Sequence, residues 1–135
     1  MRPIAPLLLF VSFCSCTGSS LNMNNEKQVR EALHGKWEST HLEKGAGRME
    51  VPKEMVSVIT YEESGSYDAR KKNGVIATTG KWTYHPKTHR LNINLDAGVV
   101  DQRIVKLTNQ ELIITNYTYS NDKVVDSLIE TYRKL

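Results

Sequence analysis

Residues 66–95 read SYDARKKNGVIATTGKWTYHPKTHRLNINL, and this stretch contains three successive strand patterns. Asn73 and Gly74 separate the first two patterns, and both residue types tolerate the positive φ angles of a type I′ hairpin turn. A turn around Pro86 leads into the third pattern, residues 91–95, where three apolar residues alternate with two asparagines. Alternation with a period of two predicts strands that have one apolar face and one polar face. The stretch therefore predicts an antiparallel meander whose apolar side chains share one face.

The same kind of pattern continues on both sides of this stretch. Apolar and β-branched runs bounded by turn residues predict eight strands, at about residues 36–43, 55–61, 66–72, 75–84, 91–95, 99–107, 111–119 and 124–132. Gly80 predicts a β-bulge in the fourth strand, and the poor alternation of residues 99–107 predicts another in the sixth. Short links force neighbouring strands to pair antiparallel. We therefore expect an all-β, eight-stranded antiparallel up-and-down barrel, because closure removes both exposed sheet edges.

A short helix is expected before the first strand. Asn25 can cap its first turn. Val29, Ala32 and Leu33 fall on one face with the spacing i, i+3 and i+4. A helix over about residues 26–33 is too short to be stable alone, so we expect it to pack against the barrel.

The first fifteen residues differ in kind from the rest of the chain. They carry one charge, at Arg2, followed by an apolar run and then small residues, which is the pattern of a secretory signal. The run is too short for a transmembrane helix, which needs about 20 apolar residues. The stretch Phe13-Cys14-Ser15-Cys16 resembles a bacterial lipobox, in which the small Ser15 precedes the cut. We therefore expect a lipoprotein signal peptide over residues 1–15; the alternatives are a plain secretory signal cut near Ser15 or Gly18, and a retained anchor helix.

This prediction makes Cys16 the lipidated residue and the anchor of the chain to a membrane. Each buried methylene of a lipid contributes about 0.8 kcal/mol, and two acyl chains are sufficient for stable anchoring. Residues 16–25 are small and polar, so we expect a flexible tether between Cys16 and a barrel domain at residues 26–135. By resemblance to other lipoproteins, Thr17 favours the outer membrane. The expected location is the bacterial cell envelope, with the protein facing the periplasm or the cell surface.

The composition excludes several other classes of protein. The 135 residues are 39% hydrophobic and 24% charged, which is ordinary for a globular domain and excludes a collagen-like or wholly disordered chain. A net charge of +3 from scattered residues is too small to indicate a nucleic-acid partner. Removal of residues 1–15 would leave Cys16 as the only cysteine, so no disulfide is expected within the mature chain.

The run Leu33-His34-Gly35-Lys36-Trp37 carries a Leu-x-Gly-x-Trp pattern at the junction of the helix and the first strand. Together with the eight strands and the terminal Arg133, it resembles the lipocalin-like superfamily over about residues 26–135, and most closely the small bacterial lipocalin-like lipoproteins. The resemblance implies that Gly35 and Trp37 lie at the closed end of the barrel and that Arg133 packs across Trp37. The chain differs from animal lipocalins in lacking their cysteine pair and their Thr-Asp-Tyr block.

Aromatic residues on the predicted strands are the candidate ligand contacts. An eight-stranded barrel can hold one small ligand or be filled by its own side chains. Pockets for small molecules favour aromatic walls with a few polar groups. The sequence leaves both interpretations open for the candidate set, which is Trp82, Tyr61, Tyr84, Tyr117, Tyr119 and His41.

We expect a binding protein and not an enzyme. No arrangement of nucleophile, base and acid can be assembled from the sequence, and no cofactor is expected. His85 and His89 flank a proline turn, so no metal site is expected there either. The first hypothesis is a membrane-anchored envelope lipoprotein whose barrel binds a small apolar or amphipathic ligand. The alternative is a filled barrel that binds a protein partner of the envelope and no small ligand.

Overall fold

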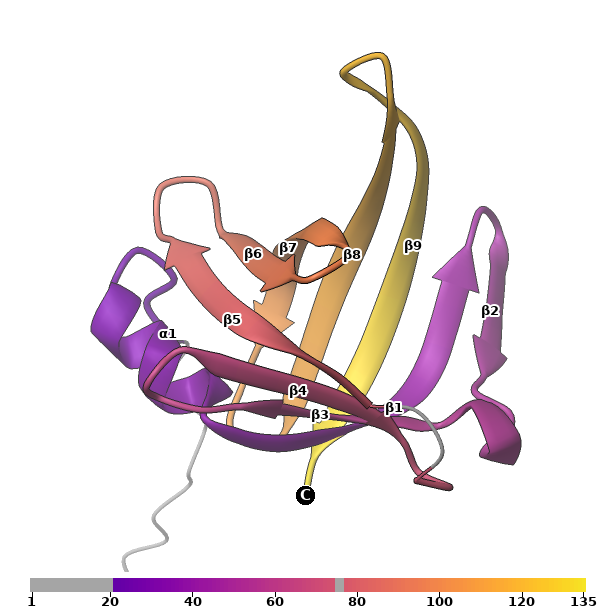
Figure 1. Ribbon diagram of the computed structural model, residues 1–135, viewed down its shortest axis with the longest axis horizontal. Helices are drawn as coiled ribbons and strands as arrows, with labels where there is room; N and C mark the ends of the chain where they lie inside the picture. The colour runs from indigo at the N-terminus through magenta and orange to yellow at the C-terminus, as the bar shows by residue number, and fades with distance from the viewer. Residues whose placement is uncertain (1–20, 75–76) are drawn as a thin grey trace, which may run out of the picture.

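The protein is an antiparallel β-barrel with one helix across an end, as a computed structural model that describes residues 21–74 and 77–135 shows (Figure 1). The elements in chain order are α1 (Glu26–Leu33), β1 (Gly35–Lys44), β2 (Gly47–Glu50), the short 3₁₀ helix η1 (Lys53–Met55), β3 (Ser57–Tyr61), β4 (Ser66–Lys71), β5 (Ala77–His85), β6 (Arg90–Leu95), β7 (Gly98–Leu107), β8 (Glu111–Ser120) and β9 (Lys123–Lys134).

Eight strands form the closed ring. Each strand from β3 to β9 pairs with the next along the chain, and β1 pairs with both β3 and β9. The predicted fold class, an all-β, eight-stranded antiparallel up-and-down barrel with a short helix, is confirmed. One additional strand was not predicted: β2 pairs with residues 41–44 of β1, on the same edge that β3 uses further down. The helix η1, with Pro52 at its N-cap, separates β2 from β3. Proline has no amide N–H to donate to a strand ladder, which favours the end of β2 before this residue.

The turns agree with the predicted hairpins but differ in type. Among the described residues 72–74 of the link between β4 and β5, only Gly74 has a positive φ, +78°, and its amide donates to the carbonyl of Lys71 at 2.8 Å. Asn73 has a negative φ, so the predicted type I′ turn is wrong at this position. The type I′ geometry occurs instead between β8 and β9, where Asn121 and Asp122 have φ values of +50° and +62°.

The residue pattern predicts two bulges in the strands, and the structure contains one of them. The predicted bulge of residues 99–107 is confirmed as a register shift between Ile104 and Lys106. The bulge predicted at Gly80 is wrong, because the pairing of β5 with both neighbours runs through this residue without a shift. Gly80 is required for another reason: a Cβ there would lie 2.2 Å from the carbonyl oxygen of Asn94.

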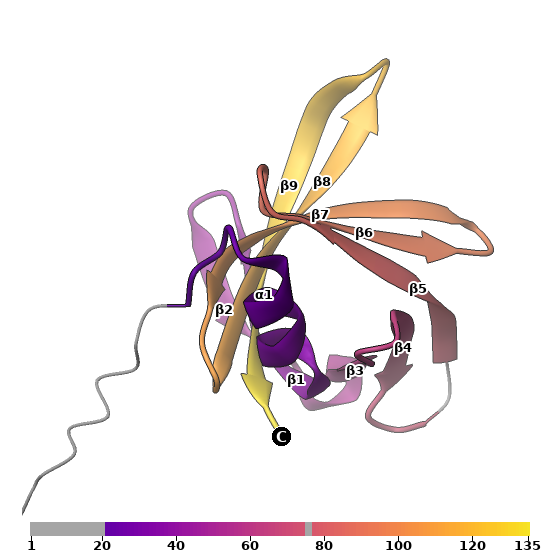
Figure 2. The ribbon, with the colours of Figure 1, turned by 90° about the vertical axis from the view of Figure 1, so that its left-hand side faces the viewer.

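The helix α1 closes one end of the barrel, in front of the ring of strands in Figure 2. Its predicted N-cap is confirmed, since the Asn25 side chain accepts a hydrogen bond from the Gln28 amide at 3.1 Å. Val29 and Leu33 are completely buried against the barrel, and the indole of Trp37 donates to the Leu33 carbonyl at 2.8 Å. The packed core of the barrel consists of Val29, Leu33, Trp37, Ile59, Tyr61, Trp82, Tyr84, Leu91, Ile93, Ile104, Leu107, Leu112, Ile114 and Tyr132.

The N-terminal predictions concern residues that lie mainly outside the described part of the chain. The predicted signal peptide over residues 1–15 and the predicted lipidation site Cys16 lie outside it, and so does the first half of the predicted tether, residues 16–20. Residues 21–25 are described, and they are ordered: Leu21 and Met23 pack against the core, and the Tyr84 hydroxyl donates to the Met23 carbonyl at 2.6 Å. The flexible tether can therefore extend at most to residue 20. Among the described residues, no helix has the length and apolar character needed to cross a bilayer.

The residue that packs across Trp37 is Lys134, and the prediction of Arg133 is wrong. The register of β1 and β9 pairs Trp37 with Lys134, whose ammonium lies 4.9 Å from the indole centroid. The same ammonium donates hydrogen bonds to the carbonyls of Ala32 and His34, at 3.0 and 2.6 Å. Arg133 is one residue earlier, so it faces outward and donates to Glu38 at 2.9 Å. Gly35 is at the same closure, with φ at +123° and an added Cβ 3.0 Å from the Lys134 side chain.

We expect Lys134→Ala to lower the free energy of unfolding by about 2 kcal/mol, because it removes a cation–π contact and two charged hydrogen bonds. Arg133→Ala should cost less than about 1 kcal/mol, because the Arg133 side chain is exposed and Glu38 keeps its ion pair with Lys72. Urea unfolding followed by tryptophan fluorescence measures both values. An equal or larger loss for Arg133→Ala would contradict the closure by Lys134.

Candidate ligand-binding site at the open end of the barrel

Successive residues of each strand face alternately into and out of the barrel, so only side chains that face inward can contact one another in the interior. On β7, β8 and β9 the inward positions at mid-barrel are polar, although the inward positions nearer the closed end are apolar. Gln102 pairs with Asn116 across β7 and β8, and Glu130 pairs with Ile114 across β8 and β9. Polar side chains on an inward face need partners inside the barrel, because water cannot reach them freely.

These side chains form a connected chain of hydrogen bonds. The amide of Gln102 donates to the Oδ1 of Asn116 at 2.7 Å, and the amide of Asn116 donates to the Oε1 of Glu130 at 2.5 Å. The hydroxyl of Tyr132 donates to the other oxygen of Glu130. We call Gln102, Asn116, Glu130 and Tyr132, with the neighbouring Tyr61 and Tyr67, the polar layer. It lies between the packed closed end and the open end.

Two tyrosines complete the polar layer from the opposite wall. The rings of Tyr61 on β3 and Tyr67 on β4 meet edge to face, with their centroids 5.5 Å apart. Burial, together with the nearby negative charge of Glu130, raises the pKa of the phenols of Tyr61, Tyr67 and Tyr132 well above the usual value of 10.0. These phenols therefore stay neutral in the folded protein and can act as donors or acceptors.

The polar layer has buried acceptor atoms that lack a partner. The Oε1 of Gln102 and the hydroxyl of Tyr61 are buried and make no hydrogen bond to any described residue. The Glu130 carboxylate accepts two hydrogen bonds and has capacity for more, since each oxygen has two lone pairs. An unpaired buried polar atom costs about 1–3 kcal/mol. The layer is therefore chemically suited to receive hydrogen-bond donors.

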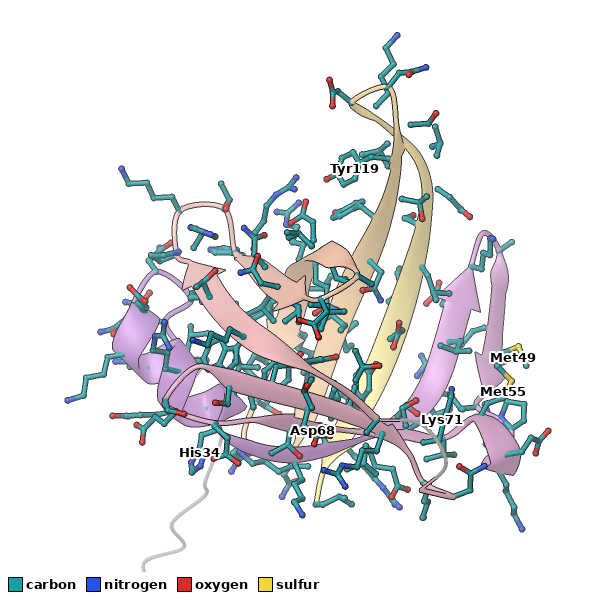
Figure 3. All side chains as sticks on the ribbon, viewed as in Figure 1. His34, Met49, Met55, Asp68, Lys71 and Tyr119 are labelled. Carbon is teal, nitrogen blue, oxygen red and sulfur yellow. The ribbon has the colours of Figure 1, made fainter. Side chains whose placement is uncertain are left out.

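A pocket lies directly above the polar layer, at the open end of the barrel. It has a volume of about 170 Å³ and is lined by Ser39, Leu42, Val51, Met55, Ser57, Lys71 and Glu130. We call it the mouth pocket. Lys71 and Met55 lie together beside η1 (Figure 3), and the Lys71 ammonium donates to the Met55 carbonyl at 3.2 Å and to the Ser57 hydroxyl at 3.4 Å. Since a water occupies about 30 Å³ of liquid, the pocket has room for a group of several heavy atoms.

The mouth pocket combines two kinds of surface. Leu42, Val51 and Met55 offer apolar contacts, and Met55 is about half exposed at the lip. Glu130 supplies a carboxylate at the floor, and Lys71 supplies an ammonium at the side. A molecule with one apolar part and one hydrogen-bonding part fits this division.

Three of the predicted ligand contacts belong to the packed core. Trp82 is 1% exposed, and its indole donates to the Glu62 carbonyl at 2.9 Å. Tyr61 packs edge to face on Trp82, with the ring centroids 5.7 Å apart, and Tyr84 is hydrogen-bonded to the N-terminal segment. None of the three lines the mouth pocket, although Tyr61 belongs to the polar layer.

The other three predicted contacts lie on the outer face of the barrel. Tyr117 alternates with the inward-facing Asn116, and Tyr119 is 43% exposed and forms a hydrogen bond to Asp101 on the outside. His41 does not share the inward face of Trp37 and Ser39, because a bulge between Ser39 and His41 reverses the alternation. None of these three side chains lines the mouth pocket.

The histidines of the β5–β6 turn contact asparagines. The Nε2 of His85 is 3.2 Å from the Asn92 amide, and the Nε2 of His89 is 3.5 Å from the Asn24 side-chain oxygen. Within residues 21–74 and 77–135, no group of three or more His, Cys, Asp or Glu residues is placed to hold a metal ion.

The polar layer and the mouth pocket were not predicted, although the sequence contains a signal for part of them. Gln102 falls between the inward-facing Val100 and Ile104, and Asn116 follows the inward-facing Ile114. A polar residue at an inward position of an apolar alternation indicates either a buried network or a ligand contact. Lys71 gives no such signal, because lysines near a turn are ordinary surface residues.

The comparisons with known proteins support the fold. No family model and no curated protein matches the chain. Among solved structures, lobster apocrustacyanin A1 matches with a TM-score of 0.55 and 11% sequence identity, over 84% of this chain and 66% of that chain. Apocrustacyanins C1 and C2 each match with a TM-score of 0.52 and 11% identity, over 78% of this chain and 62% of theirs. The chain thus spans less than two thirds of the length of these lipocalin-family structures, and the likeness shows that its fold is lipocalin-like.

The buried phenols predict a loss of stability at alkaline pH. Their folded pKa values are raised above the unfolded value of about 10, so their contribution is complete below pH 10 and is lost as the pH rises further. The urea midpoint should therefore fall between pH 9 and pH 11, and it should fall less for Tyr67→Phe. Absorbance of phenolate at 295 nm provides the direct measurement. Equal phenolate absorbance of folded and urea-unfolded protein at pH 11 would contradict the buried phenols.

Proposed function

We propose that the protein is a binding protein whose barrel takes a small amphipathic ligand through the mouth pocket, with no catalytic role. The observation that carries this proposal is the position of Glu130. Its carboxylate belongs to the hydrogen-bonded polar layer and also forms the floor of the mouth pocket. A ligand in the pocket would therefore contact the layer directly.

The chemistry of the polar layer selects the kind of ligand. Its unsatisfied atoms include the carbonyl oxygen of Gln102, and the carboxylate of Glu130 accepts hydrogen bonds. Both require donors, so the polar part of the ligand is an amine or a hydroxyl group. The apolar part lies against Leu42, Val51 and Met55, where burial contributes about 25 cal/mol per Å² of apolar surface.

The proposal includes a membrane anchor at Cys16. The apolar run before it, the small Ser15 and the polar residues after it support this part. The barrel begins its packing at Leu21, so a tether of only a few residues would hold it close to the membrane surface. The proposed location is the bacterial cell envelope, at the outer membrane.

A second candidate function is supported by the packed closed end and by the exposed apolar residues. Trp37, Trp82 and Tyr61 fill the interior that a large ligand would occupy. Met49 and Met55 near the open end are each about half exposed, and Val124 and Val125 next to the β8–β9 turn are similarly exposed. A filled barrel that binds a protein partner through these residues is the alternative to a ligand carrier.

The ligand proposal is tested with n-hexylamine as probe and hexanoate as its counterpart of opposite charge. Calorimetric titration should show saturable one-to-one binding of hexylamine, and hexanoate should bind at least tenfold more weakly. Glu130→Gln should weaken hexylamine at least tenfold, because it removes the charge but keeps the shape. Glu50→Gln on the exposed strand β2 is the matched control and should change binding less than twofold.

Two results would overturn the ligand proposal. The first is that hexylamine fails to saturate the wild-type protein, and the second is that hexanoate binds as tightly as the amine. The second result would indicate that the Lys71 ammonium, and not the Glu130 carboxylate, binds the charged group of the ligand.

The anchor is tested separately with Cys16→Ala. The wild-type protein, expressed in a bacterial host, should be found in the membrane fraction, because its acyl chains partition into lipid. Cys16→Ala should move it to the soluble fraction after cell disruption. Unchanged fractionation of the variant would contradict a lipid anchor at this residue.

A further inference from the structure

Two arginines face each other on the outside of the barrel. Arg90 on β6 and Arg103 on β7 are direct partners in the antiparallel register, and both lie on the face opposite to the inward Leu91 and Gln102. Side chains directly opposite across two strands are about 5 Å apart at Cβ, and like charges at this spacing repel each other. The pair therefore destabilises the empty protein unless a negative charge lies close to both.

The protein supplies such a charge to only one of the two. Arg90 forms an ion pair with Asp101 through its Nη1. Arg103 makes no hydrogen bond or ion pair with any described residue, and its side chain is exposed. One guanidinium thus remains uncompensated beside its neighbour.

Arg90 is held in a fixed orientation by three groups. Its Nη1 donates to Asp101 and also to the Tyr119 hydroxyl at 3.0 Å, and this hydroxyl donates to Asp101 at 2.8 Å. The Arg90 guanidinium carbon lies 5.6 Å from the centroid of the Tyr117 ring. These contacts use Nη1 and leave Nε and Nη2 without a hydrogen bond in the described part of the chain. A donor that is held in place before binding loses less entropy when a ligand arrives.

An open surface cavity is lined by both arginines. It has a volume of about 260 Å³ and is lined by Thr88, Arg90 and Arg103. Thr88 belongs to the turn between β5 and β6, where the following His89 has a positive φ of 57°. The side chains of these three residues carry two guanidinium groups and one hydroxyl, all of which can donate hydrogen bonds.

We propose that this cavity, the outer arginine site, binds a phosphate group. Arginine forks bind phosphate oxygens bidentately, and a tetrahedral oxyanion has enough oxygens for three donors that approach from different sides. The phosphate would neutralise Arg103 and relieve its repulsion of Arg90. The group could be free phosphate or part of a phosphate ester such as a lipid headgroup. The outer arginine site is separate from the mouth pocket, since Tyr119 and Lys71 lie in different regions of the molecule (Figure 3).

The site is tested on the full chain, purified in detergent, with inorganic phosphate and with sn-glycerol 3-phosphate as probes. Calorimetric titration should show saturable binding of at least one probe. Arg103→Gln should weaken it at least tenfold, and Arg48→Gln on the exposed strand β2 should change it less than twofold, although both variants lose one positive charge. Tighter binding of the glycerol ester would assign the site to esters, and equal or tighter binding of inorganic phosphate would assign it to free phosphate.

A thermal measurement provides a second and independent readout. Without phosphate, Arg103→Gln should raise the melting temperature, because it removes the repulsion between the paired arginines. With phosphate, the melting temperature of the wild-type protein should rise and that of Arg103→Gln should stay constant. Failure of both probes to saturate the wild-type protein, or an equal loss of binding in Arg103→Gln and Arg48→Gln, would overturn the proposal.

Discussion

The pairing of β1 with β9 is the constraint on which the rest of the structure depends. It closes the ring, and it decides which residues of both strands face the interior. The register places Trp37 opposite Lys134 at one end and Leu42 opposite Glu130 at the other. A shift of one residue would exchange the inner and outer faces of a strand. It would then replace Lys134 by Arg133 over the indole and remove Glu130 from the mouth pocket.

The bulge in β1 shows how local backbone geometry changes the chemistry of the interior. Without it, the alternation from Trp37 and Ser39 would place His41 inside the barrel. The shift between Ser39 and His41 turns His41 outward and brings Leu42 to the inner face, where it lines the mouth pocket. The open end therefore has an apolar wall at this strand and an acidic floor at Glu130.

A polar layer in the middle of a barrel costs stability. Gln102, Asn116 and Glu130 occupy inward positions where aliphatic residues would pack without any need for partners. The closed end contains such residues, among them Leu91, Ile93 and Leu112. The contrast between the two halves supports the proposal that the layer serves binding, while the closed end provides stability. The neutral side chains of Tyr61 and Tyr67 contact both the polar layer and the apolar core.

The sequence predicts the fold far better than it predicts the site. Alternation and turn residues are local signals, so they identify the strands and the helix, whereas the position of Trp37 at the closed end was implied by the resemblance to lipocalins. The site depends on two features that are not local. Bulges decide the face of His41, and the register across β1 and β9 decides between Arg133 and Lys134. Tyr117 and Tyr119 look like interior residues by composition, but the alternation of β8 from Leu112 onward assigns both to the outer face.

The central claim is that the polar layer and the mouth pocket hold a ligand in the native protein. Native mass spectrometry of the mature protein, isolated from the membranes in which it is produced, tests this claim most directly. We expect one adduct of defined mass on the wild-type chain, in addition to any acyl groups, and we expect Glu130→Gln to lose it. A bare wild-type chain, or an adduct with unchanged occupancy in Glu130→Gln, would contradict it.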